Sequence, residues 1–424
     1  MSAGRLWGGL VLAILLASGR AEATAPSTFG HGARSAALVR ADVADADPAG
    51  APVQNAALAA APGARVRLGY GYGLLDLRID DRRADVADVS GLDLGVQVGF
   101  RLPASFFLGF ALAAHVPDAQ IAKIGFRPGT EPQFVRYEAA LQRATFDLAL
   151  ALRRGPFALG IGAALALDMG GEGTRFELGQ DAEGTYADAA SDISLAYRAA
   201  PIVGLAVDLG RVAFGASLRG GLGVSVAVDS DVRIALAENP LNGTTQVRVR
   251  GVSGYDPARF VFGARAKVGS GFSVLGSIEW QGYSDAPPPV ADVSLDVALG
   301  TSPGRTEVRF VAPNFRDVLV PRLGVEWTTG RWAVRAGYAL SPSPVPPQRG
   351  FTSYADATRH AVGLGGGVGL GRVWGVDLRA DLAAQVSFLA ERAEEKASPA
   401  LPNARYVVSG RVVHGALSVE AAFR

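Results

Sequence analysis

The amino-acid sequence predicts an all-β fold: a transmembrane antiparallel β-barrel of about 14 strands with an N-terminal plug. Three observations favour this fold class. Apolar residues recur at every second position from residue 65 onward, which is typical of strands with one apolar face. Tight turns alternate with long connections, as in membrane barrels with short turns at one rim and long loops at the other. Aromatic residues gather beside the short turns, where such barrels carry interfacial girdles.

The amino-acid composition excludes several other classes of protein and of functional site. Of 424 residues, 49% are hydrophobic and 19% charged, which excludes a disordered chain. The absence of cysteine excludes disulfides, thiol nucleophiles and thiolate metal sites. The net charge is only +1, so we expect no nucleic-acid partner.

Residues 1–23 have the layout of a secretory signal peptide. Arg5 precedes an apolar run from Leu6 to Ala17, and the small-x-small site Ala21-Glu22-Ala23 follows. We expect Sec-dependent export and cleavage after Ala23. The alternative is a membrane anchor, but the apolar run is shorter than the ~20 residues that span a bilayer.

Residues 24–64 are the predicted plug. This segment is rich in Ala, Asp and Pro and shows no alternation, and a short helix is expected from Ala33 to Val43. A barrel of about 14 strands encloses a lumen too wide for its own side chains to fill, so a plug is expected there. The alternative is a flexible periplasmic tail.

Residues 65–424 are the predicted barrel. In one strand Leu92, Leu94, Val96, Val98 and Phe100 alternate with small or polar residues. The expected strands are 65–80, 89–102, 105–116, 136–153, 156–170, 191–209, 211–230, 258–268, 271–283, 315–329, 331–341, 358–371, 373–390 and 404–424.

The connections separate into two kinds. Tight turns are expected at Pro103-Ala104, Gly155, Gly210, Ser270, Gly330 and Gly371-Arg372, and long loops at 117–135, 171–190, 231–257, 284–314, 342–357 and 391–403. A soluble sandwich has no reason to separate its loops by length, and no repeat marks a propeller. Aromatic residues of the apolar face lie near the tight turns: Phe100, Phe106, Phe157, Phe214, Phe272, Trp327, Trp332 and Trp374.

Three segments carry a family resemblance. They are 32–58 in the plug, Val334-Arg335-Ala336-Gly337-Tyr338 with the following Ser341 to Pro346, and Asp356 to Leu364. Together with length and strand count, they make the chain resemble the outer-membrane long-chain fatty-acid and aromatic-hydrocarbon transporters, the FadL/OmpP1/TodX-like family. The resemblance implies a monomeric 14-stranded barrel whose N-terminal hatch gates passive uptake of hydrophobic molecules, with lateral release into the membrane.

The chain departs from this family at two places. The family's hatch carries Asn-Pro-Ala, and here only Asn55 matches because Ala56 replaces the proline. The chain also ends in Phe423-Arg424, whereas these barrels generally end in an aromatic residue that the barrel assembly machinery recognises. Phe423 keeps the alternation of the last strand.

The sequence gives little support for a catalytic site or a metal site. The four histidines, His31, His115, His360 and His414, are scattered in sequence, and none stands beside a serine in the arrangement that a lipase needs. No spacing of acidic residues matches a calcium loop. We expect no enzyme and no cofactor.

Charged residues on the lumen side of the strands have two open interpretations. They either form a paired ladder that holds the hatch or simply wet the pore; they are Asp147, Arg265, Lys267, Glu279, Arg322, Glu326, Arg335, Asp377, Arg379 and Asp381. The predicted ligand-binding residues are Asn55 in the hatch, Arg335 as a carboxylate partner, and Ile121, Ile124 and Phe126 as an apolar capture surface. For these three apolar residues, packing within the loop is an equally open interpretation. The resemblance also suggests a kinked third strand, whose inward residues Gly109, Ala111 and Ala113 are small, as a lateral exit.

The leading functional hypothesis is a bacterial outer-membrane channel for hydrophobic compounds, first of all long-chain fatty acids. The alternative is a small general porin or a structural surface barrel. Expected partners are hydrophobic small molecules, outer-membrane lipid, lipopolysaccharide and the barrel assembly machinery.

Overall fold

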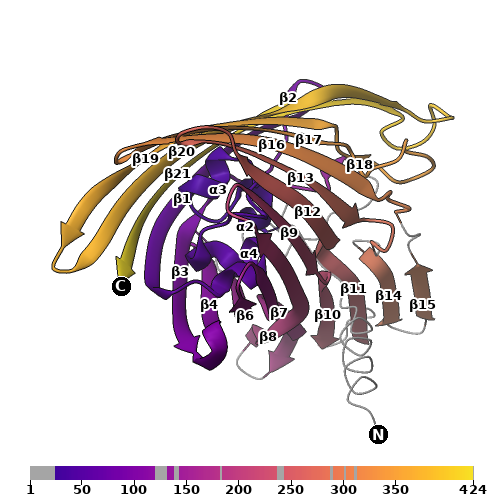
Figure 1. The fold of residues 1–424 in the computed structure, drawn as a ribbon. Helices are drawn as coiled ribbons and strands as arrows, with labels where there is room; N and C mark the ends of the chain where they lie inside the picture. The colour runs from indigo at the N-terminus through magenta and orange to yellow at the C-terminus, as the bar shows by residue number, and fades with distance from the viewer. Residues whose placement is uncertain are drawn as a thin grey trace, which may run out of the picture.

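Fourteen strands pair in sequence into a closed antiparallel barrel (Figure 1). A computed structural model describes residues 24–119, 131–137, 143–181, 184–235, 243–286, 290–299, 302–309 and 313–423. In order around the barrel, the strands are β1 (Gly63–Ile79), β3 (Val89–Leu102), β4 (Phe106–Pro117), β6 (Thr145–Arg154), β7 (Phe157–Asp181), β8 (Gly184–Asp208), β9 (Val212–Arg219), β12 (Ala258–Lys267), β13 (Phe272–Gly282), β16 (Val318–Thr329), β17 (Trp332–Ser341), β19 (Arg359–Val373), β20 (Val376–Glu395) and β21 (Arg405–Phe423).

The barrel closes between its first and last strands. Ala64 of β1 lies opposite Phe423 of β21, and the pairing continues without a break to Ile79 opposite Val408. Because the last strand meets the first, neither edge is left unpaired, which is the condition for strands that face lipid. The predicted fold class is confirmed.

Side chains alternate across the barrel wall. In β3, Leu92 and Phe100 are 47% and 56% exposed on the outside, while Asp93 and Gln97 are buried on the inside. The described outward side chains of the other barrel strands are likewise mostly apolar, and the inward face carries polar side chains together with small residues that contact the hatch. The eight predicted aromatic residues all lie near the rim of short turns.

Short turns occupy one rim of the barrel. The connection 103–105 contains a 3₁₀ turn, η3 (Pro103–Ser105), and Gly155, Gly210, Gly269, Gly271 and Gly330 take positive φ in the others. One turn was predicted three residues too early: Trp374 and Gly375 form it, with φ of 48° and 83°. Gly371 instead lies at a register shift inside β19. Trp374 is therefore fully exposed in a turn and does not begin β20.

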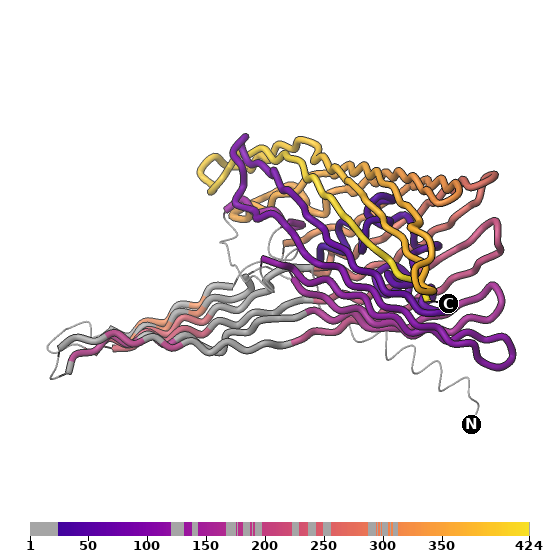
Figure 2. Tube along the Cα trace, turned by 90° about the vertical axis from the view of Figure 1, so that its left-hand side faces the viewer, coloured from indigo at the N-terminus to yellow at the C-terminus, as the bar shows by residue number. Residues whose placement is uncertain are grey.

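At the opposite rim the sheet of the barrel is extended in place of three predicted loops. β7 and β8 continue well beyond their contacts with β6 and β9, and β10 (Leu222–Ala235) pairs in parallel with β7. β11 (Gly243–Asp256), β14 (Val290–Leu299) and β15 (Ser302–Arg309) complete this extension. Figure 2 shows it projecting away from the barrel. The expectations of loops over 171–190, 231–257 and 284–314 were therefore wrong for the described residues.

Residues 24–62, here called the hatch, fill the lumen. Their short helices are α2 (Ala25–Phe29), α3 (Ala33–Ala37), η1 (Pro48–Gly50), α4 (Ala51–Gln54) and η2 (Ala56–Ala59). Figure 1 shows α2, α3 and α4 enclosed by the strands. The helix predicted over 33–43 ends early, because Val39 and Arg40 take positive φ. None of the described helices is long and apolar enough to cross a membrane.

Small residues let the hatch backbone touch the wall. Gly204 of β8 is one example, since a Cβ there would lie 2.2 Å from Asn55 Oδ1. Elsewhere the contact is alanine against alanine, as where Ala56, Ala59 and Ala60 pack on the inward faces of β4, β6, β7 and β8. The alanine-rich composition of the hatch thus fits a dense packing in which few voids remain.

Candidate functional site

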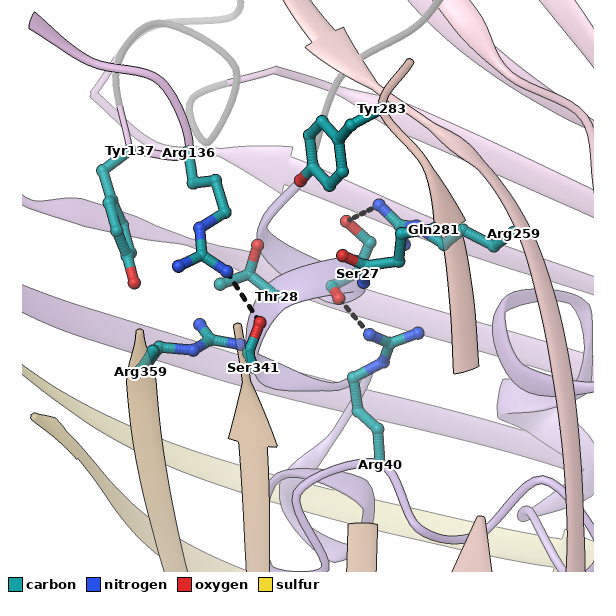
Figure 3. Close-up of a pocket in the computed structure, with 10 residues that line it drawn as sticks. All are labelled: Ser27, Thr28, Arg40, Arg136, Tyr137, Arg259, Gln281, Tyr283, Ser341 and Arg359. Atoms are coloured by element: carbon teal, nitrogen blue, oxygen red, sulfur yellow. Dashed lines mark hydrogen bonds between the residues drawn. The ribbon is translucent and has the colours of Figure 1, made fainter. Parts of the chain in front are cut away.

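A cavity lined by arginines lies between the hatch and the long-loop rim. Its volume is about 20 Å³, room for about one water molecule or one small polar group. Figure 3 shows the ten side chains that surround it: Ser27, Thr28, Arg40, Arg136, Tyr137, Arg259, Gln281, Tyr283, Ser341 and Arg359.

The hatch supplies the floor of this cavity. A Thr24–Ser27 capping box starts α2 and places Ser27 and Thr28 beneath the cavity. Two guanidinium groups bind Ser27: Arg40 donates to its carbonyl oxygen, and Arg259 donates to Oγ at 3.1 Å. The floor is therefore tied to the wall by a hydrogen bond from β12.

One carboxylate on the wall serves three arginines. Glu279 of β13 is fully buried and lies 3.2 Å from Arg40 Nη2, 3.0 Å from Arg322 Nη1 and 3.8 Å from Arg259 Nε. Asp256 also pairs with Arg259. A buried carboxylate is stable only when its charge is compensated, and here the compensation exceeds one charge.

The loop above the cavity contributes a further arginine. Arg136 follows the short strand β5 (Gln133–Phe134), and β5 pairs with β18 (Tyr354–Ala355). Its Nε donates to Asp356 at 3.0 Å, and its two Nη groups donate to Ser341 Oγ and to the carbonyl oxygen of Ala357, each at 2.7 Å. Burial opposes the charge, but the Asp356 carboxylate, its hydrogen bond and the neighbouring Tyr137 and Tyr283 together outweigh burial and raise the pKa of Arg136 above its ordinary value. Arg136 therefore stays cationic.

Among the residues that the structure describes, positive charge exceeds negative charge at the cavity. Five guanidinium groups, of Arg40, Arg136, Arg259, Arg322 and Arg359, face three carboxylates, of Glu279, Asp256 and Asp356. The Arg359 guanidinium makes no ion pair within the part of the chain that the structure describes, and its buried Nε has no hydrogen-bond partner there. An unsatisfied buried donor is costly, so an anion in this cavity would stabilise it.

Apolar clusters flank the arginines. Tyr137 packs with Phe29 and Phe134 in one buried cluster, and Tyr283 packs with Phe315 in another. The cavity thus brings guanidinium groups beside the rings of Tyr137 and Tyr283, which connect it to the two apolar clusters. A molecule with an anionic head and an apolar body matches both parts.

A second charged network fixes the hatch farther down the lumen. Arg34 of α3 donates through Nε to Glu326 Oε2 at 3.0 Å, and Arg335 Nε binds the same carboxylate. Arg335 Nη1 also donates to Asp381 at 2.7 Å. Of the two interpretations of the lumen charges, these contacts support the paired ladder that holds the hatch.

The predicted site residues do not come together at the cavity. Asn55 is completely buried and donates through Nδ2 to the carbonyl oxygens of Val43 and Leu205, while its Oδ1 accepts from Ala57 N. These are the contacts of a hatch anchor, and Arg335 belongs to the network of Glu326. Ligand roles for Asn55 and Arg335 stay predictions. Ile121, Ile124 and Phe126 lie outside the described residues.

Sequence reasoning missed the arginines of the cavity, although signals existed for two of them. Arg259 has the inward parity of β12, since Phe260 and Phe262 point outward. Arg359 lies in the segment that resembles the transporter family. Arg136 was assigned to a strand over 136–153, but β6 begins at Thr145.

The third barrel strand does not form the suggested kink. β4 pairs with β3 from Phe106 to Pro117 and with β6 from Phe106 to His115, with no register shift in either pairing. An apolar groove does lie on the outer wall beside it, over β4, β6, β7 and β8. It is lined by Phe110, Leu148, Ala149, Leu150, Ile161, Gly162, Ala163, Ala199, Ala200, Pro201, Ile202 and Val203.

Comparison with solved structures identifies the fold. The chain is similar to a Pseudomonas aeruginosa FadL homologue (14% identity, TM-score 0.55, 96% of this chain and 99% of that one) and to the Pseudomonas putida toluene transporter TodX (15%, 0.56, 94% and 99%). It is also similar to the Ralstonia pickettii toluene transporter TbuX (12%, 0.53, 94% and 99%). No family model and no curated protein matches the sequence.

Proposed function

We propose that this chain is an outer-membrane channel for passive uptake of hydrophobic compounds that carry a carboxylate, with long-chain fatty acids as the first candidates. The observation that carries the proposal is the cavity in which arginines of the hatch, the wall and a loop meet beside two apolar clusters. Membership of the FadL/OmpP1/TodX-like family is part of the proposal. In the proposed outer-membrane location, the rim of short turns faces the periplasm.

The filled lumen argues against a general porin. Hatch atoms lie against the inward faces of β4, β6, β7, β8, β19 and β20, so an ion has no continuous wide path past them in this conformation. A porin of this strand number would instead leave an aqueous channel. The outer apolar surface provides the contact with membrane lipid and lipopolysaccharide.

The charge of the cavity favours an acid over a hydrocarbon. TodX and TbuX are toluene transporters, and toluene has no charged group. Here the excess positive charge would serve no purpose for such a ligand and would oppose its entry by keeping water in place. A carboxylate accepts paired hydrogen bonds from guanidinium groups.

The hatch can respond to a bound acid because Arg40 is shared. Arg40 belongs to the hatch and binds Glu279 of the wall. A ligand carboxylate that takes over Arg40 replaces a hatch–wall ion pair with a hatch–ligand one. The hatch is then held less firmly, which is a direct route to ligand-gated diffusion.

The groove over β4 and β6–β8 is the candidate for lateral release. Its inner lining consists of alanines of the wall, covered by alanines of the hatch, and its outer lining is apolar. A ligand that leaves the lumen there enters an apolar environment directly.

Uptake of two probes with the same chain tests the proposal. Cells without their own fatty-acid channel express the protein, and labelled oleate and labelled oleyl alcohol are supplied under identical conditions. We expect saturable oleate uptake that falls about 10–100-fold at low substrate in Arg359→Gln, the effect of losing one charge-assisted hydrogen bond. Arg405→Gln is the matched control, because Arg405 pairs with Glu395 on the exposed surface.

The outcomes separate the hypotheses. Equal uptake of both probes, unchanged in Arg359→Gln, would overturn the carboxylate preference and favour uncharged hydrocarbons. A folded barrel that takes up neither probe but conducts simple ions in single-channel recordings would be a porin.

A further inference from the structure

Three of the four histidines gather at one contact between the hatch and the barrel. His31 of the hatch, His115 of β4 and His414 of β21 are 2%, 5% and 7% exposed. The fourth, His360, is exposed and contacts Tyr338 Oη at 2.8 Å. The cluster lies apart from the arginine cavity and has no part in the proposed function.

Two facing glycines make room for the imidazoles of the wall. Gly71 of β1 lies opposite Gly91 of β3. A Cβ on Gly71 would lie 2.9 Å from His414 Nε2, and one on Gly91 would lie 3.0 Å from His115 Nε2. The ring of Phe29, the last residue of α2, stacks on His414 with centroids 4.5 Å apart. The N-terminal part of the hatch thus rests on histidines.

The hydrogen bonds of His31 require a neutral ring. The Arg67 guanidinium has only donors, so its contact with His31 makes Nδ1 an acceptor. Nε2 then carries the single hydrogen and donates to the carbonyl oxygen of Ala114 at 3.2 Å. A proton added at Nδ1 would place two donors against each other.

The surroundings offer little compensation for a second positive charge. The charged and titratable groups that face the contact are Arg67 of β1, Asp93 of β3, His115 of β4, His414 and Glu420 of β21, and Asp47 of the hatch. Asp93 already accepts from Gly32 N at 2.9 Å and from His115 Nδ1 at 2.8 Å. Burial, with Arg67 acting in the same direction, lowers the pKa of His31 to about 4.

We propose that the Gly30-His31-Gly32 turn is an acid-sensitive latch, in which protonation of His31 breaks its bond with Arg67 and releases the N-terminal part of the hatch from β1, β3 and β4. The Arg67 guanidinium lies close to Gly32, where a Cβ would be 2.9 Å away, so it has little room to withdraw on that side. Gly32 N, held by Asp93, moves with the turn.

The expected size follows from the proton affinity of His31. In a released hatch the histidine meets water and regains its ordinary pKa of 6.5. Each pKa unit is a factor of ten in proton binding, so lowering the pH from 8 to 5 favours the released state by about 30-fold.

The absence of cysteine in the chain allows a clean test. Ala25→Cys places a single thiol in α2, 6% exposed, at the edge of the small cavity beside His115 and His414. Ser270→Cys, in an exposed turn, is the reference for the intrinsic pH dependence of labelling. The measured quantity is the ratio of the two labelling rates with a thiol reagent at pH 8 and pH 5, on the whole purified barrel.

We expect this ratio to rise about 30-fold at pH 5 and to stay flat in His31→Gln, whose side-chain amide can accept from Arg67 and donate to Ala114. His360→Gln, the exposed control, retains the rise. A second variant, Arg67→Gln, removes a charge that lowers the pKa of His31, so the rise in the ratio is expected to be smaller than in the parent protein. A flat ratio in the parent protein, or an undiminished rise in His31→Gln, would overturn the proposal.

Discussion

Arg34 of the hatch and Arg335 of the barrel wall bind the same oxygen of Glu326, Oε2, each through Nε. The shared carboxylate joins a helix of the plug to β16 and β17. Asp381 takes the next bond from Arg335, and Asp45 takes one from Arg34 at 3.0 Å. The network of ion pairs on the inner wall of the barrel thus extends into the hatch.

Removing the charge of Glu326 is expected to weaken this joint. Glu326→Gln leaves two buried guanidinium groups facing each other, so we expect a loss of about 3–5 kcal/mol in the free energy of unfolding, measured by denaturant titration in detergent. Glu395→Gln is the control, since its pair with Arg405 is 78% and 66% exposed. That variant should lose at most about 1 kcal/mol. Equal losses in the two variants would contradict the anchoring role.

A methyl group on β8 is expected to displace the hatch. In Gly204→Ala the new Cβ would lie 2.2 Å from Asn55 Oδ1, and either the strand or the hatch must shift. We expect a destabilisation of about 1–3 kcal/mol, read from the thermal midpoint. Gly276→Ala is the matched change, because its nearest atom would lie 3.8 Å away. An unaltered midpoint in Gly204→Ala would show that the hatch does not need this contact.

Asp42 gives a pH-dependent prediction. Burial raises the pKa of this hatch carboxyl above 3.8, although Arg34 acts against the change. The folded state therefore binds the proton more tightly than the unfolded chain, and stability falls as pH rises through the raised pKa. Asp42→Asn stays neutral and keeps an oxygen for the bond from Ser35 Oγ.

We expect Asp42→Asn to be more stable than the parent protein at pH 7 and equal to it near pH 3.5. Unfolding free energies at the two pH values provide the measurement. A variant that is less stable at pH 7 would mean that attraction to Arg34 outweighs the cost of burial.

The predicted signal peptide has a direct test. Protein isolated from the outer membrane is expected to begin at Thr24, the residue that starts the capping box of α2. Terminal sequencing of the purified barrel gives the answer. A mature chain that begins at Pro26 would lack this cap, and one that retains Met1 would overturn the predicted cleavage.

The barrel was predictable because the sequence of each strand shows which side chains face outward and which face the lumen. Residues such as Leu92 and Asp93 sit on opposite faces, one toward lipid and one toward the lumen, so the pattern needs no knowledge of distant contacts. Glycines with positive φ, such as Gly155 and Gly330, then mark the short turns.

The same logic explains the errors. The distal parts of β7 and β8 pair with each other beyond the barrel, where no lipid-facing side imposes alternation, so the residues from Gly171 onward looked like a loop. Gly371 resembled a turn because a register shift in the middle of a strand also selects glycine.

The arginine cavity could not be predicted from the sequence as a site. Its residues come from the hatch, a loop and the ends of four strands, separated by up to 332 positions between Ser27 and Arg359. Only the closed ring brings them together. The alternation within β12 predicts that Arg259 points inward, but it does not predict which residues lie beside it.

The pairing of Ala64 with Phe423 has a consequence for shortened products of this chain. A product that stops before β21 leaves β1 without its partner along a run of 16 residue pairs and exposes β20 as well. Two open strand edges in hydrocarbon are prohibitively costly, so a truncated copy is expected to be rejected before it settles in the bilayer. Closure of the barrel therefore depends on β21 as well as on β1.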